Sequence, residues 1–195
     1  MEKICFLITR KDGLTRPEFF AHYLQVHSLL GLRSCVLMAG YSLNLTDREG
    51  PGFPGPDSIT EAWTPDASGF VDPARAFRNE DEMNELMADD RSFIGTNLGY
   101  IVEEELVYGR WPTGELRTRT PGVKRISLHT GDAIPTVGDG IERMVVDRVK
   151  STLLSEASPK VDFFLSEWAP SQGALPKIDR PAFIVSEYCQ RHPKR

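Results

Sequence analysis

The order of strand-like and helix-like segments constrains the fold of this chain more than any other feature. Short runs that alternate apolar and polar side chains predict strands, and runs with apolar residues three or four apart predict helices. The first part of the chain has, in order, a strand at 3–9, a helix at 15–31, strands at 41–46 and 58–63, a helix at 81–93 and a strand at 100–108. This order is typical of the split βαβ or ferredoxin-like unit, an antiparallel sheet with two helices on one face.

Two local signals refine this order. Thr15, Pro17 and Glu18 form a capping box with proline in the first turn, which predicts a helix start. Residues 48–56 are rich in glycine and proline, and they predict an exposed loop or a lid over a nearby cleft.

The second part of the chain repeats the pattern incompletely. Residues 111–122 are rich in Pro, Gly, Thr and Arg and predict a linker. Strands are predicted at 123–129, 161–168 and 182–188, and a helix is predicted at 140–154. Glu61-Ala62-Trp63 resembles Glu167-Trp168-Ala169, a weak internal repeat. We therefore expect one unit at 1–110, a linker at 111–122 and a second, truncated ferredoxin-like unit at 123–195.

Composition excludes several classes of function. The 195 residues carry a net charge of -5, so nucleic acid and anionic membranes are not expected partners. No apolar run is long enough to span a bilayer or to form a signal peptide, which predicts a cytoplasmic protein. The three cysteines are far apart and predict neither a disulfide framework nor a zinc site. No common cofactor motif is present, so we expect no cofactor and no metal.

His27 is the leading candidate for chemistry. In helical geometry it shares an apolar face with Phe20, Tyr23 and Leu24. Burial disfavours the imidazolium, so a neutral imidazole could take a proton from a substrate and return it. The alternative is a core histidine that is hydrogen-bonded to a backbone carbonyl.

Glu61 is the predicted partner of His27. Strand alternation places it on the face of Ile59 and Trp63, where a buried carboxylate could orient the imidazole. The alternative is a solvated strand end. Tyr23 could stabilise an oxyanion, or it could be plain core.

Four more residues are candidates for substrate binding. His22 lies about 140° around an α-helix from His27, so the two should not reach one group unaided. A packing or interface role for His22 is the alternative. The candidates are Phe20, His22, Tyr41 and Trp63.

The first unit resembles the EthD family. The helix of that family carries a Phe, then an aromatic residue that is commonly Trp, then a His, at the spacing of Phe20, Tyr23 and His27. Tyr23 replaces the usual Trp, and His22-Tyr23 stands at the usual aromatic pair. Residues 57–63 and 100–105 stand where the family has its third and fourth strands, so the resemblance covers about residues 1–110.

The resemblance implies a dimeric α+β barrel, in which two ferredoxin-like sheets pack face to face with a pocket in each unit. It also implies a small aromatic or cyclic substrate. The second part of the chain would either supply the partner sheet within one chain, as a tandem pseudo-dimer, or extend the interface of a true homodimer.

Four functions fit these observations. The first is a cofactor-independent lyase, most concretely a dehydratase, or an isomerase, with His27 as general acid and base. The second is a cofactor-free monooxygenase. The third is a non-catalytic ligand-binding accessory protein. The fourth uses His27 as a haem ligand.

Overall fold

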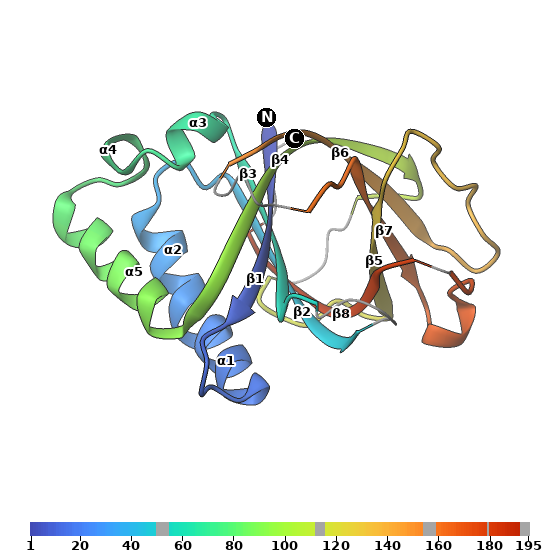
Figure 1. Cartoon of the computed structure of the whole chain (residues 1–195), viewed down its shortest axis with the longest axis horizontal. Coiled ribbons are helices and arrows are strands. Elements are labelled where there is room, and N and C mark those ends of the chain that lie inside the picture. Colours follow the sequence, from blue (N-terminus) through green and yellow to red (C-terminus); the bar gives the residue numbers. More distant parts are fainter. Residues whose placement is uncertain (50–54, 112–115, 154–158, 179, 192–195) are drawn as a thin grey trace.

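Strands from both parts of the chain close into one antiparallel barrel (Figure 1). The computed structural model describes residues 1–49, 55–111, 116–153, 159–178 and 180–191. The strands are β1 (Glu2–Arg10), β2 (Gly40–Glu49), β3 (Ser58–Thr64), β4 (Ile94–Tyr108), β5 (Val123–His129), β6 (Arg143–Thr152), β7 (Phe163–Ala169) and β8 (Ala182–Arg191). Around the barrel they follow the order β1-β3-β2-β8-β5-β7-β6-β4.

Within the described residues, the α-helices and the π-helical turn all lie on the side of the barrel that is built from the first part of the chain (Figure 1). They are α1 (Arg16–His22), the π-helical turn η1 (Tyr23–His27), α2 (Ser28–Ser34), α3 (Ala67–Phe70), α4 (Pro73–Ala76) and α5 (Glu80–Phe93), and a 3-10 turn, η2 (Gln172–Ala174), lies between β7 and β8. The predicted capping box at Thr15 and Glu18 is present at the start of α1.

The barrel wall separates two apolar clusters. On β1, Ile4 and Phe6 belong to the cluster under the helices. Cys5 and Leu7, which alternate with them, belong to a second cluster inside the barrel. Both faces of this strand are therefore buried, one against helices and one against the opposite wall.

The predicted fold class, ferredoxin-like units that form a dimeric α+β barrel, is wrong. The structure is a closed eight-stranded antiparallel barrel within a single chain. The helix predicted at 140–154 is strand β6 instead. Met144, Val145 and Val146 are all buried there. Met144 and Val146 pack in a cluster that includes Ile134 and Leu175 from the loops, while Asp147 on the other face meets Lys3 inside the barrel. Continuous apolar character rich in valine fits a strand that is buried on both faces.

The two parts of the chain contribute their strands in the same order. The first four strands are neighbours in the order β4-β1-β3-β2, and the last four in the order β8-β5-β7-β6. β3 and β7, which carry the weak internal repeat, thus take corresponding places. The domain limits of 1–110 and 123–195 remain a prediction. Residues 50–54 of the predicted loop or lid, and 112–115 of the predicted linker, lie outside the described residues.

Candidate active site

A π-helical turn brings both histidines of the first helix to one carboxylate. The amide of Ser28 donates a hydrogen bond to the carbonyl of Tyr23, five residues earlier. In such a turn residues five apart lie nearly above one another, whereas in an α-helix they diverge by about 140°. His22 Nε2 lies 2.7 Å from Asp89 Oδ1, and His27 Nδ1 lies 2.8 Å from Asp89 Oδ2. His22 and His27 were not expected to reach one group unaided in an α-helix, and the π-helical turn is what brings both to Asp89.

His27 has one ring nitrogen engaged and one available. With Nδ1–H donating to Asp89, the neutral imidazole carries its lone pair on Nε2. Nε2 makes no hydrogen bond within the part of the chain that the structure describes. The ring is held between Tyr23 and Phe93, with centroids 5.1 and 4.8 Å away. A fixed tautomer and a fixed ring plane are what a general base requires.

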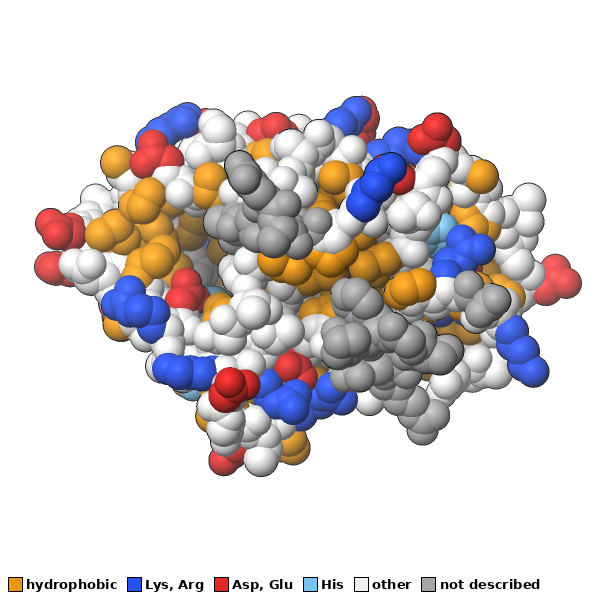
Figure 2. All heavy atoms as spheres, in the orientation of Figure 1, with side chains coloured by type: hydrophobic (Ala, Val, Ile, Leu, Met, Phe, Trp, Pro, Cys, Tyr) orange, Lys and Arg blue, Asp and Glu red, His pale blue; other side chains and the backbone are white. Residues whose placement is uncertain are grey.

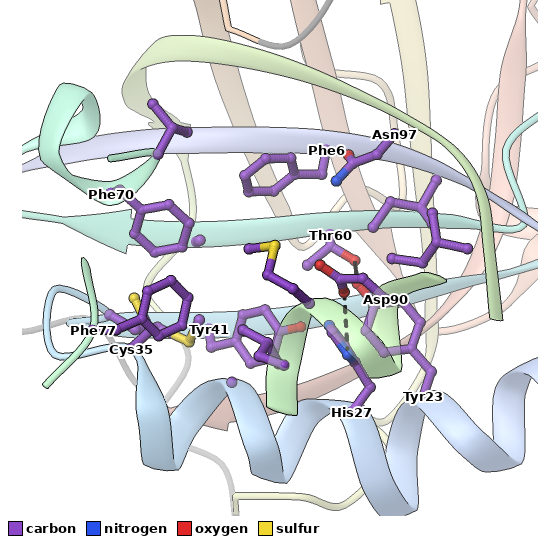
Figure 3. Close-up of a pocket in the computed structure, with 18 of the residues that line it drawn as sticks. Phe6, Tyr23, His27, Cys35, Tyr41, Thr60, Phe70, Phe77, Asp90 and Asn97 are labelled. Carbon is purple, nitrogen blue, oxygen red and sulfur yellow. Dashed lines mark hydrogen bonds and ion pairs between the residues drawn. The ribbon is translucent and has the colours of Figure 1, made fainter. Parts of the chain in front are cut away.

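A cavity of about 300 Å³ lies between the helices and the sheet, and His27 lines it (Figure 3). Its walls are mainly apolar. The apolar lining residues are Phe6, Ile8, Ala62, Phe70, Val71, Pro73, Phe77, Met38, Leu86, Met87 and Ile94. Figure 2 shows hydrophobic side chains gathered at the surface over the helical layer. The volume and lining suit a small ring compound.

The polar side chains of the cavity gather toward one end. Figure 3 shows Thr60, Asp90 and Asn97 toward this end, and Phe70 and Phe77 toward the other. Asp90 Oδ1 lies 3.5 Å from His27 Nδ1. Burial raises the pKa of Asp90, and the charge of the adjacent Asp89 adds to that rise while His27 opposes it.

Asp89 differs from its neighbour in its electrostatics. Burial alone would raise the pKa of Asp89, but hydrogen bonds from His27 and His22 hold it below the usual value. The two adjacent carboxyl groups therefore differ in acidity. Asp89 is the stronger acid of the two and orients His27, while Asp90 is the weaker acid and holds its proton to higher pH than Asp89.

Two tyrosines, Tyr23 and Tyr41, also contribute polar groups to the cavity lining. The Tyr23 hydroxyl lies 2.8 Å from Thr60 Oγ1 and also forms a hydrogen bond with Tyr41. Burial raises the pKa of Tyr23 and Tyr41 above the usual range. Both phenols are therefore neutral and can donate hydrogen bonds.

The structure brings only some of the predicted site residues together. His27, Tyr23 and Tyr41 line the cavity, and their catalytic and substrate-binding roles stay predictions. Glu61 and Trp63 do not line it. They share a strand face as predicted, but that face looks into the barrel, and Thr60 and Ala62 face the cavity instead. The predicted His27–Glu61 pair is therefore not formed.

Two predicted substrate-binding residues lie beside the cavity lining and not in it. Phe20 is partly buried and packs against the cluster under the helices. The His22 ring packs against Phe93 in a tilted arrangement, with ring centroids 4.7 Å apart, and His22 shares Asp89 with His27. His22 therefore supports the position of Asp89.

Asp89 and Asp90 were missed in the sequence. The signal was available, because a helix was predicted at 81–93, and helical geometry puts Leu86 and Met87 on one apolar face of it. Asp90 follows Leu86 by four residues and Met87 by three, so its carboxyl lies on that same face. A carboxylate on the apolar face of a helix is the pattern that would have found it.

Inside the barrel Glu61 belongs to a second cluster of charges. Lys3 Nζ lies 2.6 Å from Glu61 and 2.8 Å from Asp147, and Lys124 Nζ lies 2.7 Å from Glu61. Burial alone would raise the pKa of Glu61, but Lys124 and Lys3 hold it well below its usual range. Glu61 is therefore an ionised structural carboxylate that neutralises two buried lysines.

The same cluster shows the internal repeat at atomic level. Lys3 lies over the Trp63 ring, 4.9 Å from its centroid, and Lys124 lies over Trp168 at 4.4 Å. Trp63 donates its indole N–H to Glu104 at 3.1 Å, and Trp168 donates to Glu187 at 3.0 Å. Corresponding strands of the two halves thus carry corresponding Lys, Trp and Glu side chains.

Comparison with known proteins adds no assignment: the chain matches no protein-family model and no curated protein. Among the described residues, no helix is both long and apolar enough to cross a membrane.

Proposed function

We propose that this protein is a cofactor-independent lyase or isomerase that acts on a small ring compound, with His27 as the general base. One observation carries the proposal. His27 is held by Asp89 at 2.8 Å, its Nε2 has no partner among the described residues, and its ring lines an apolar cavity of about 300 Å³. The resemblance to the EthD family supports the same residue as functional.

Dehydration is the most concrete version of the reaction. His27 Nε2 would take the proton from the carbon beside a ring carbonyl, and the electron pair would move onto the carbonyl oxygen. The enolate would then reform its carbonyl as the bond to a β-hydroxyl breaks. Protonated Asp90 or His27 would supply the proton, so that water leaves. The products are an unsaturated ketone and one water molecule.

The side chains at the polar end of the cavity suit the two proton transfers. Asp89, with its lowered pKa, stabilises the imidazolium that forms when His27 takes a proton. Asp90, with its raised pKa, suits a proton donor. The Tyr41 hydroxyl, in the cavity wall, is hydrogen-bonded to Tyr23 and would have to turn from it to donate to the enolate oxygen.

A model substrate tests the proposal. 3-Hydroxy-1-tetralone has the ring, the carbonyl and the β-hydroxyl, and its dehydration gives a naphthol that is followed by fluorescence. We expect the protein to accelerate this reaction, and His27→Gln to lower the rate about 100-fold or more. Gln25→Ala is the matched control, because Gln25 is exposed on the same π-helical turn. Equal rates for His27→Gln and the unmodified protein would refute the role of His27.

Ligand binding without turnover is the second candidate function. It is favoured by the Tyr23 hydroxyl, which already pairs with Thr60 and Tyr41 and is not free for an oxyanion. Under this alternative the tetralone binds, the rate of its dehydration equals the rate in buffer, and His27→Gln changes the affinity alone.

A further inference from the structure

We propose that His22 is a positioning residue that gives the two adjacent carboxyl groups of α5 different roles: it holds Asp89 as the partner of His27 and leaves Asp90 as the proton donor. The inference rests on the proposed function, because it concerns the same base, His27. It adds a residue outside the cavity lining, and it explains why one of two neighbouring carboxyl groups orients the imidazole and the other does not.

Two carboxyl groups from consecutive residues compete for one N–H donor. His27 Nδ1 lies 2.8 Å from Asp89 Oδ2 and 3.5 Å from Asp90 Oδ1, and Figure 3 shows Asp90 beside the His27 ring. The first distance is that of a hydrogen bond, and the second is beyond the normal range. A turn of the two side chains would be enough to exchange the partners, because both carboxyl groups already lie beside Nδ1. Something else must therefore favour Asp89.

His22 supplies the contact that favours Asp89. Its Nε2 lies 2.7 Å from Asp89 Oδ1, the oxygen that His27 does not use. A carboxylate can only accept, so each histidine donates to one oxygen of Asp89. Asp89 cannot turn away from His27 without losing the bond from His22. No side chain among the described residues holds the Asp90 carboxyl group in this way.

The ring of His22 is itself held in position. It packs against Phe93 with ring centroids 4.7 Å apart, and the His27 ring packs against the same phenylalanine at 4.8 Å. Phe93 is buried and follows Asp89 by four residues on α5, so it lies on the same face of that helix. The His22 side chain is 31% exposed and does not line the cavity, so a change there should leave the cavity wall intact.

The acidities of the two carboxyl groups agree with this arrangement. Burial alone would raise the pKa of Asp89, but hydrogen bonds from His27 and His22 hold it below its usual value. Burial raises the pKa of Asp90, where His27 opposes the rise and the charge of Asp89 adds to it. Loss of His22 should therefore make the two groups more alike. The other charged or titratable groups that face this pair are Arg91, Tyr23 and Tyr41.

Carbon-13 NMR titration of the aspartate carboxyl groups tests the inference without any turnover. In the unmodified protein Asp90 should release its proton at higher pH than Asp89. His22→Ala should bring the two titrations closer together. His22→Gln, whose side-chain N–H can replace the lost donor, should keep them apart. Gln25→Ala, an exposed change on the adjoining π-helical turn, is the control and should leave both titrations unchanged.

Turnover of 3-hydroxy-1-tetralone gives a second readout. We expect His22→Ala to lower kcat about 10-fold, as the loss of one hydrogen bond to a charged group implies. KM should change less than about twofold, because His22 does not line the cavity. The fall of kcat at alkaline pH should move to lower pH, because Asp90 then takes the hydrogen bond from His27. His22→Gln should restore both kcat and the pH profile.

Three results would overturn the inference. They are the same titration of Asp89 and Asp90 in the unmodified protein, an unchanged separation in His22→Ala, and a loss in His22→Gln equal to that in His22→Ala. The third would assign the effect of His22 to the packing of its ring on Phe93. The first result needs no variant, so it does not depend on the folding of one. The proposed function fails separately, if the carboxyl groups titrate as expected but 3-hydroxy-1-tetralone is not turned over.

Discussion

Asp89 accepts a hydrogen bond from His27 Nδ1 at 2.8 Å, and this contact fixes which nitrogen of His27 is available for chemistry. The two residues come from different helices, η1 and α5, which pack on the same side of the barrel. The π-helical turn also brings His22 to the second oxygen of Asp89, so both histidines hold the same carboxylate.

Replacement of Asp89 should impair catalysis and leave the cavity in place. Asp89→Asn removes the charge that stabilises the His27 imidazolium, and it allows the other tautomer. We expect kcat for 3-hydroxy-1-tetralone to fall about 100-fold. Asp81→Asn, an exposed change of the same kind on the same helix, should keep kcat within twofold. If both variants behave alike, Asp89 does not orient the base.

Asp90 should control the alkaline side of the pH profile. Because burial raises its pKa, Asp90 holds its proton to higher pH than an ordinary carboxyl group, and the donor is lost as the pH rises through that value. We expect kcat to fall on this side in the unmodified protein. In Asp90→Asn kcat should be low and no longer fall there. An unchanged profile in the variant would assign the proton donor to another group.

Glu61 should matter for stability because it neutralises Lys3 and Lys124 inside the barrel. Glu61→Ala leaves two buried ammonium groups short of a carboxylate, and we expect it to lower the free energy of unfolding by about 3–5 kcal/mol. Urea denaturation measures this change. Glu105→Ala, an exposed change on β4, should cost less than about 0.5 kcal/mol. A cost for Glu61→Ala as small as this would mean that the cluster contributes little.

The stability of the barrel should depend on pH through Asp147. Burial raises its pKa to about 7, and Glu104 and Glu61 add to the rise although Lys3 opposes it. A raised carboxyl pKa stabilises the folded state fully below the unfolded pKa of about 4, and this contribution is lost as the pH rises through about 7.

Denaturation in urea between pH 5 and 8 measures the Asp147 contribution. As the pH rises, the loss of one proton from Asp147 should lower the free energy of unfolding of the unmodified protein by up to about 1 kcal/mol for each pH unit. Asp147→Asn should flatten this slope. Asp139→Asn, an exposed change, should keep the slope. The same slope in Asp147→Asn would show that Asp147 is already ionised.

Local signals in the sequence predicted the helical side of the structure well. The capping box at Thr15 and Glu18 is present, and the apolar face with Tyr23 and His27 does line a cavity. These features depend on neighbouring residues within one helix, where periodicity is informative. The π-helical turn was not predicted, because nothing in the residue types of 23–27 distinguishes it from an α-helical turn.

Long-range features were harder to predict. Every residue of β3 is buried, so alternation grouped Glu61 with Trp63 correctly but could not tell which face met the helices. In β6 the run of valines, buried on both sides, was mistaken for a helix. Closure of the barrel depends on the pairing of β2 with β8 and β4 with β6, which join segments far apart in the chain. No local pattern specifies these pairs.

Deuterium exchange into a substrate that cannot lose water tests the role of His27 most directly. 6-Hydroxy-1-tetralone has the carbonyl and a ring hydroxyl but no β-hydroxyl, so only removal and return of the proton beside the carbonyl can occur. Proton NMR in deuterated buffer follows that exchange. We predict that the protein accelerates the exchange well above the rate in buffer, that Gln25→Ala keeps the acceleration and that His27→Gln abolishes it. Exchange at the buffer rate with the unmodified protein, or equal acceleration by His27→Gln, would contradict the assignment of His27 as the base.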